Sequence, residues 1–301
     1  MKRKIIRQGN NTLTITLPRK WTQDFKISQG DELDLEITGN RIVLSTQKKA
    51  TKEKTTKDIS NLKSVLPLCI LLMYRKGYDE IELHFDNPKL IFLISNLVHQ
   101  IGFHILEQGS NHCILKTLSD VDDMDSSEMI RKLFLSIKIK LEKIIESLQQ
   151  NDPFLLQSII AMNETPGKIK NFCYRLVSKK RFDKSDLGSY YLAILRDLDN
   201  LDSLLNILIN SISGISDLKS QKKLLSTLEE FERLFELYYA NHFAGNLEQF
   251  PSLISNTKSF LERVYLQATD LSAEENRMFL LINNSSLHLE NLINTTFLMK
   301  I

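Results

Sequence analysis

Apolar and polar residues alternate strictly over two short stretches near the N-terminus, which is typical of half-buried strands. The stretches cover residues 13–17 and 33–37, and a Gly-Asn turn leads from the second into residues 42–44. Pro18 is suited to opening a short helix between them, because proline is tolerated at the first helical position. The order predicted for residues 1–46 is therefore strand, strand, short helix, strand, strand.

A unit of this length buries too little surface to be stable by itself, since small domains hide only about 60% of the area of their unfolded chain. Residues 1–46 are therefore expected to complete their core with a second copy. The sequence predicts a homodimer.

Residues 47–58 contain one small apolar residue and are predicted to form an exposed linker. Residues 59–119 then read as a small α/β domain in which two helices cover one face of a three-stranded sheet. The expected elements are a helix over 59–76, a strand over 80–85, a helix ending at 100, and strands over 103–108 and 112–118. An acidic stretch over 120–125 separates this domain from the rest of the chain.

From residue 126 onward the pattern is helical throughout. One apolar stripe recurs in steps of three and four residues, at Ile130, Leu133, Phe134, Ile137, Leu141, Ile144, Ile145 and Leu148. Further helices are predicted over 152–180, 186–213, 217–243, 247–269 and 273–299.

These helices repeat at an offset of 91 residues, at which residues 198–201 fall on 289–292. The same offset aligns the other two helix pairs without a gap. The sequence therefore predicts two tandem three-helix bundles, over 126–213 and 217–301. The whole chain is predicted to be a multi-domain, mainly α protein with a small N-terminal β domain.

The composition is that of a soluble globular protein, with 42% hydrophobic and 25% charged residues among 301. No apolar run approaches the roughly 20 residues of a spanning helix, and no signal peptide is visible. We therefore expect a cytoplasmic protein without membrane insertion. The three isolated cysteines favour reduced thiols over disulfides or structural zinc.

The charge is distributed unevenly, although the total is only +2. Residues 1–58 carry 13 basic and 7 acidic side chains, and the first twenty residues carry six basic side chains and no acidic one. This asymmetry indicates either contact with a polyanion or a merely basic, solvated surface.

Sequence motifs for common enzyme chemistries are absent. The chain has no GxxxxGK[ST], GxGxxG or GxSxG run, and its six histidines form no HxxxH or HExxH pattern. An enzyme is therefore not expected. A metal-dependent hydrolase in particular lacks an assembled acid, base and nucleophile.

Residues 7–21, RQGNNTLTITLPRKW, and residues 27–33, ISQGDEL, resemble the SpoVT/AbrB-like swapped-hairpin family. The resemblance implies two interlocked chains that bind DNA through a basic face. The residues expected to contact backbone phosphates are Lys2, Arg3, Lys4, Arg7, Arg19 and Lys20. Thr12 and Thr14 are expected to add hydroxyl contacts.

The tandem bundles resemble PhoU, the phosphate-uptake regulator, whose third helices carry an acid-x-x-x-Asp motif that holds divalent metal. Asp199 and Glu290 occupy the first acidic positions, whereas Ser203 and Asn294 stand where the second carboxylates would be. Asp202 is a substitute ligand at the first site. Two interpretations stay open, a divalent cation held by these three acids or solvated acids on a bundle surface, and the lost carboxylates favour the second.

Taken together, the segments resemble the PhoU-related regulators typical of archaea. The resemblance implies a DNA-binding transcriptional regulator of phosphate uptake, in which the bundles sense phosphate status. The alternative is a PhoU-like adaptor that binds phosphate transporter or signalling subunits and uses the N-terminal domain only to dimerise.

Overall fold

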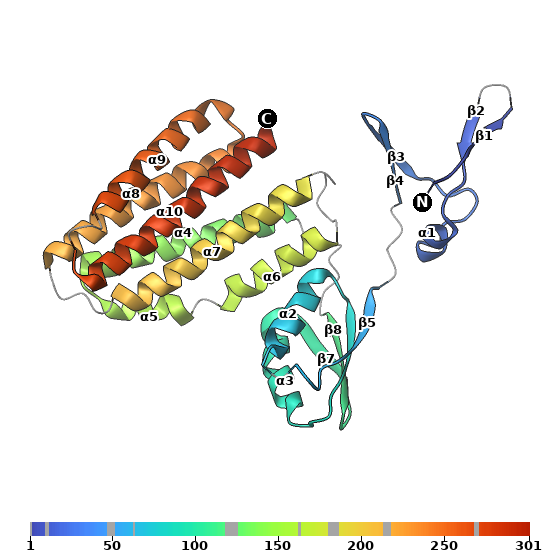
Figure 1. Ribbon diagram of the computed structural model, residues 1–301, viewed down its shortest axis with the longest axis horizontal. Helices are drawn as coiled ribbons and strands as arrows, with labels where there is room; N and C mark the ends of the chain where they lie inside the picture. Colours follow the sequence, from blue (N-terminus) through green and yellow to red (C-terminus); the bar gives the residue numbers. More distant parts are fainter. Residues whose placement is uncertain are drawn as a thin grey trace. The chain divides into compact units, whose positions relative to one another are not determined.

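The computed structural model divides the chain into two compact units, 1–54 and 55–301 (Figure 1). It describes residues 2–9, 12–46, 52–62, 64–117, 126–161, 164–179, 187–212, 218–267 and 271–301. Most of the chain is helical, as predicted. Among the described residues, no helix has both the length and the apolar character needed to cross a membrane.

The N-terminal unit consists of two antiparallel hairpins with a short helix between them. The first hairpin pairs β1 (Ile5–Gln8) with β2 (Thr12–Ile15), and the second pairs β3 (Asp34–Thr38) with β4 (Arg41–Ser45). The helix α1 (Arg19–Asp24) follows the proline that the sequence places at its start. The predicted order of elements in this unit is confirmed.

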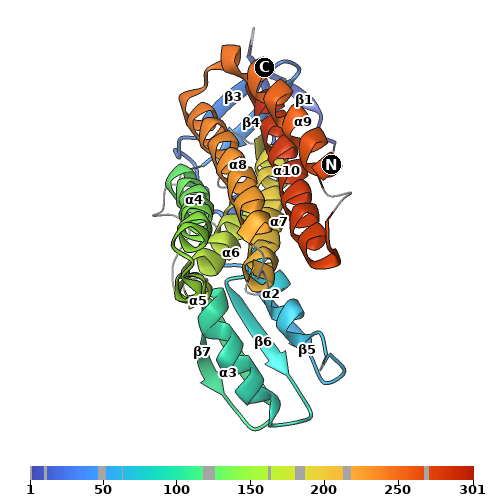
Figure 2. The same cartoon turned by 90° about the vertical axis from the view of Figure 1, so that its left-hand side faces the viewer.

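The next part of the chain forms a sheet whose strands lie in the order β5-β6-β8-β7, with two helices on one face (Figure 2). Its elements are β5 (Lys54–Asp58), α2 (Leu66–Lys76), β6 (Glu80–His84), α3 (Leu90–Ile101), β7 (Phe103–Gln108) and β8 (His112–Thr117). Alternate side chains of the central strands, Ile81, Leu83, Cys113 and Leu115, are fully buried in a core shared with α2 and α3. This alternation places the helices over one face of the sheet.

The structure corrects two predictions in this region. The sheet has four strands rather than three, because residues 54–58 of the expected linker form the edge strand β5; residues 47–51 of that linker lie outside the described residues. Threonines favour extended backbone, and lysines suit an exposed sheet edge. The helix expected over 59–76 begins only at Leu66, where Pro67 fits the first turn.

From residue 126 onward, the described elements are helical, as the periodicity predicts. They are α4 (Ser126–Gln150), α5 (Pro153–Ala161), α6 (Glu164–Ser178), α7 (Gly188–Ile212), α8 (Leu218–Ala244), α9 (Phe250–Gln267) and α10 (Ala273–Lys300), with the 3₁₀ turn η3 (Leu247–Gln249) before α9. Phe134, Leu201, Phe235 and Leu292, which come from both sequence halves, are fully buried in one apolar core. The two halves therefore form one helical part and not two separately packed bundles, and their likeness to PhoU stays a prediction.

The third helices of the two halves, α7 and α10, lie side by side (Figures 1 and 2). They run antiparallel, because Ile207 near the end of α7 lines the same groove as Glu274 and Arg277 at the start of α10. Midway along this contact, His288 Nδ1 lies 2.8 Å from Asp197 Oδ1, and these residues are 91 positions apart, the period of the repeat. The two halves are thus related by approximate twofold symmetry about this pair.

A buried ion pair fastens the α/β part to the helical part. Arg175 on α6 is only 1% exposed, and its guanidinium donates hydrogen bonds to the Asp79 carboxylate and to the backbone carbonyls of Tyr74 and Tyr78. The ammonium of Lys179 donates to both oxygens of the same carboxylate, at 2.7 and 2.6 Å. Removing one partner of such a buried pair costs about 3–5 kcal/mol. This contact fixes the α/β part against α6.

The helical core contains a buried histidine in a small polar network. His242 Nδ1 lies 3.0 Å from Thr296 Oγ1, and the Tyr238 hydroxyl lies 2.9 Å from the same oxygen. Burial lowers the pKa of His242 to about 4. The ring is therefore neutral in the folded protein at neutral pH.

The folded protein should therefore be less stable in acid. Between pH 6.5 and about 4 the unfolded chain binds a proton at His242 that the folded chain does not bind, so stability is complete above this window and falls as the pH falls through it. The full loss is about 3 kcal/mol. Denaturant titrations at several pH values should show that His242→Leu removes about 1.4 kcal/mol per pH unit from the slope near pH 5. Parallel curves for the two proteins would contradict this assignment.

Candidate functional site

The basic side chains of the N-terminal unit lie in two groups. Lys2, Arg3 and Lys4 precede β1, whereas Arg19 and Lys20 form the first turn of α1. All five are exposed, as contact with a polyanion requires.

The remaining candidates for DNA contact lie on opposite faces of the first hairpin. Arg7 pairs with Leu13, and directly opposed residues of an antiparallel pair point to the same face. Thr12 and Thr14 pair with Gln8 and Ile6 and so belong to the other face. The Thr14 hydroxyl also donates a hydrogen bond to a backbone carbonyl of β1, at 3.2 Å. The eight predicted DNA-binding residues therefore do not form a single face within one chain.

The Gly-Asp pair of the quoted motif has a local structural role in the loop between α1 and β3. Gly30 has a φ of +92°, a conformation that favours glycine. The Asp31 carboxylate accepts a hydrogen bond from the Ser28 backbone N–H at 2.6 Å. These contacts shape the turn that leads into the second hairpin.

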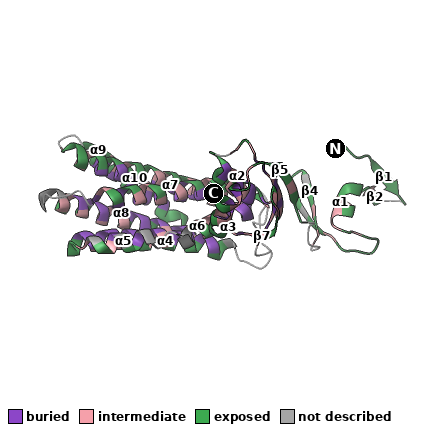
Figure 3. Cartoon of the chain, turned by 90° about the horizontal axis from the view of Figure 1, so that it is seen from below, coloured by how far each residue is buried: buried purple, intermediate pink, exposed green. Residues whose placement is uncertain are grey.

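Each hairpin leaves an apolar face exposed in the single chain. Ile5, Leu13 and Ile15 share one face of the first hairpin, and Leu13 is 67% exposed. On the second hairpin Ile37 pairs with Ile42, and Ile37 is 70% exposed. Residues 2–9, 12–35, 37, 39–40 and 42–46 are all at least partly exposed, and Figure 3 shows no buried colour on β1, β2 or α1. The unit therefore exposes apolar side chains of the kind that a partner chain would bury.

The comparison with known families identifies this unit. Residues 6–53 match the family of antidote-toxin recognition MazE, bacterial antitoxin. Residues 6–53 form a MazE/AbrB-like domain. Such domains typically bind DNA and dimerise, and the match is consistent with a DNA-binding or regulatory function. The match extends beyond the predicted boundary at residue 46, in agreement with the unit that ends at residue 54.

The match does not reach the helical part of the chain. No curated protein and no solved structure matches this chain.

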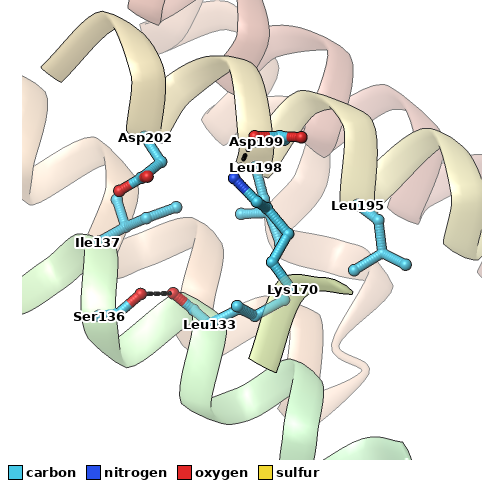
Figure 4. Close-up of a pocket in the computed structure, with 8 residues that line it drawn as sticks. All are labelled: Leu133, Ser136, Ile137, Lys170, Leu195, Leu198, Asp199 and Asp202. Atoms are coloured by element: carbon cyan, nitrogen blue, oxygen red, sulfur yellow. Dashed lines mark hydrogen bonds and ion pairs between the residues drawn. The ribbon is translucent and has the colours of Figure 1, made fainter. Parts of the chain in front are cut away.

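Two of the predicted metal ligands, Asp199 and Asp202, lie on α7 and face the neighbouring helices α4 and α6 (Figure 4). The ammonium of Lys170 on α6 donates a hydrogen bond to Asp199 Oδ1 at 2.6 Å, and the Arg75 guanidinium lies 3.8 Å from Asp199 Oδ2. A lysine thus occupies the place where a cation would approach this carboxylate.

Asp202 has a lysine partner as well. The ammonium of Lys140 on α4 donates to the Asp202 carboxylate and, at 2.8 Å, to Asn206 Oδ1. The Lys140 side chain is 4% exposed. Burial lowers the pKa of Lys140 below its ordinary value, and the Asp202 carboxylate opposes part of that shift. We refer to Lys140, Lys170, Asp199 and Asp202 as the lysine–aspartate cluster.

This donor set does not fit a divalent cation. Each aspartate already has an ammonium partner. The pocket that the two aspartates line encloses about 10 Å³, which is room for at most one water molecule. The third predicted ligand, Glu290, lies on another helix, α10. The described residues contain no group of three histidine, cysteine, aspartate or glutamate side chains placed to hold a metal. Asp199 and Asp202 are not freely solvated acids either, because each has an ammonium partner.

The two lysines of the cluster were not predicted, although the sequence carries a signal for one of them. Lys140 lies between Ile137, Leu141 and Ile144 on the apolar stripe of its helix. A lysine in such a stripe needs an acidic partner on a packed helix, because an unpaired buried charge is costly.

Lys140→Met should destabilise the protein by about 1–3 kcal/mol, because it leaves Asp202 without its cation while that carboxylate is only 20% exposed. Lys143→Met on the same helix is the control, since Lys143 pairs with Glu146 at the surface and should change stability by less than about 0.5 kcal/mol. Chemical denaturation measures both. Equal effects, or a large loss of wild-type stability on adding a chelator, would contradict this assignment.

The isolated unit 1–54 should sediment as a dimer at micromolar concentration. Ile15→Glu places a charge opposite Ile5 on the apolar face, and losing this burial in both chains should raise the dissociation constant at least about 100-fold. Gln8→Glu introduces the same charge on the opposite face and should leave the dimer intact. A folded wild-type monomer would contradict the proposed assembly.

Proposed function

We propose that this protein is a homodimeric, DNA-binding transcriptional regulator. The observation that carries the proposal is the exposed apolar face on each N-terminal hairpin, in a domain of a type that typically binds DNA and dimerises. Joining two copies through these faces brings two sets of exposed basic side chains together. Arg7 shares the face that this joining covers, so it is not among the proposed phosphate contacts.

The proposed contacts are mainly electrostatic. Lys2, Arg3, Lys4, Arg19 and Lys20 are exposed, and lysine and arginine bind backbone phosphates while releasing condensed counterions. Such contacts set affinity and position on the duplex, whereas sequence is read by groups that reach the base edges. These five residues therefore account for affinity and not for sequence preference.

The helical part is proposed to receive the regulatory signal, and phosphate status is the proposed signal. This step rests on the resemblance of the repeated helices to PhoU, with the twofold relation between their third helices as structural support. The proposal includes phosphate transporter or signalling subunits as partners, a cytoplasmic location and no catalytic activity.

Salt dependence tests the DNA-binding step. If about six phosphates are neutralised, the logarithm of the binding constant should fall against the logarithm of salt with a slope near −5. Arg19→Ala with Lys20→Ala removes up to four contacts per dimer, so the slope should become shallower by up to about 3.6. Fluorescence anisotropy with duplex DNA from the promoter of the protein's own operon measures both slopes.

The matched control is Lys222→Ala with Lys258→Ala, which removes two exposed lysines from the helical part. This variant should bind with the wild-type slope. An unchanged slope in the Arg19 and Lys20 variant would instead favour the adaptor function, in which the N-terminal unit only dimerises.

A further inference from the structure

The helix α6 holds an arginine of the α/β part on its outer face. The Arg75 guanidinium of α2 lies 4.2 Å from the centre of the Tyr174 ring and donates hydrogen bonds to Asn171 Oδ1 at 3.0 and 2.8 Å. Asp199 on α7 adds a carboxylate oxygen 3.8 Å from the same guanidinium. An aromatic ring, an amide oxygen and a carboxylate thus hold one arginine. We call Asn171, Tyr174 and Asp199 the Arg75 site.

The helix α9 is the counterpart of α6 in the second half of the helical part. α6 packs against α4 and α7, and α9 packs against α8 and α10, as the twofold relation between the halves requires. The repeat of 91 residues aligns the Arg75 site with three residues of the second half, which we call the α9 site: Glu262, Tyr265 and Glu290. The side of α10 that carries Glu290 faces α9, because Asn283, two turns earlier, donates a hydrogen bond to the Leu261 carbonyl at 3.1 Å.

The α9 site lacks the arginine that fills its counterpart. Tyr265 is 62% exposed, whereas Asn171 of the Arg75 site is buried under the α/β part. Within the part of the chain that the structure describes, neither Glu262 nor Glu290 has a hydrogen-bond or ion-pair partner through its side chain. The cation next to Glu262 on α9, Arg263, is paired with an acid of α8. The site therefore presents its ring and its carboxylates to solvent.

The charge of the α9 site has changed in the direction that favours a cation. In the Arg75 site the ammonium of Lys170 neutralises Asp199, and the repeat places Leu261 at the position of this lysine. The neutral Asn171 is replaced by the acidic Glu262. The α9 site thus has one more carboxylate than its counterpart and has lost the lysine that the first half supplies.

We propose that the α9 site binds an arginine side chain that a partner protein presents. A guanidinium stacks on an aromatic ring and donates charge-assisted hydrogen bonds to carboxylates, which are the two kinds of group that the site offers. Lysine is less suited, because its ammonium is a compact point charge without a planar face. Leu266, which is 66% exposed beside Tyr265, offers an apolar contact to the partner.

The arginine is assigned to a different protein because the arginine that fits such a site in this chain, Arg75, is already held on α6. The inference rests on the proposed function in one respect, namely that the helical part binds transporter or signalling subunits. The α9 site gives such a subunit a place to dock and predicts what its contact surface contains. It does not involve the N-terminal unit, so it is independent of DNA binding.

Fluorine NMR of the full chain tests arginine recognition directly. Tyr265→Trp keeps an aromatic face at the site, and labelling with 5-fluorotryptophan then gives two resonances, because Trp21 is the only native tryptophan. Adding N-acetylarginine amide should shift the resonance of the introduced tryptophan to saturation, whereas the Trp21 resonance should not move. N-acetyllysine amide should bind at least about threefold more weakly, because it cannot stack or fork.

Charge-removing variants in the same background identify the carboxylates. Glu262→Gln with Glu290→Gln should weaken binding of the arginine probe about tenfold, since each exposed ion pair contributes up to about 1 kcal/mol. The matched control, Glu248→Gln with Glu274→Gln, removes two exposed acids elsewhere on the helical part and should leave binding unchanged. Circular dichroism checks that the helices of all variants are intact.

A shift that does not saturate, or equal shifts of both resonances, would overturn the proposal. Equal binding of the arginine and lysine probes would overturn it too, since the site would be a general acidic patch. Binding that survives the double glutamine variant would contradict the assignment of the carboxylates. DNA binding measured on the same samples separates these outcomes from a failure of the proposed function, because it depends on the N-terminal unit alone.

Discussion

The apolar faces of the two N-terminal hairpins are exposed among the described residues of one chain, and the proposed dimer and its proposed DNA-binding surface both depend on this. Leu13 and Ile37 are each about two-thirds exposed, although their strands alternate as core strands do. A single chain gains little stability from these residues, because the hydrophobic contribution follows the apolar area removed from water. In the proposed dimer, a second chain would supply the missing core and, with it, double the basic surface.

Much of the fold could be predicted from residue patterns, because the patterns are local. The alternation in β2 and β3 and the three-to-four spacing of the later helices indicate which side of each element is apolar. Gly39 indicates the turn between β3 and β4. The strand over Lys54–Asp58 escaped prediction because edge strands are polar and their pairing partner, β6, is distant in sequence. The shared core of the two helical halves likewise depends on how helices pack, which periodicity does not encode.

The candidate metal site shows how packing decides the chemistry of a residue. Asp199 and Asp202 were identifiable as acids in a degenerate motif, but their partners, Lys170 and Lys140, come from two other helices. Those lysines neutralise the carboxylates without a metal.

The most direct test of the dimeric N-terminal unit is an isotope-filtered nuclear Overhauser experiment on residues 1–54, with labelled and unlabelled chains mixed. An interlocked dimer predicts contacts between chains from the methyl groups of Leu13 and Ile15 to apolar side chains of the other copy. A monomeric mass with every observed contact inside one chain would contradict it.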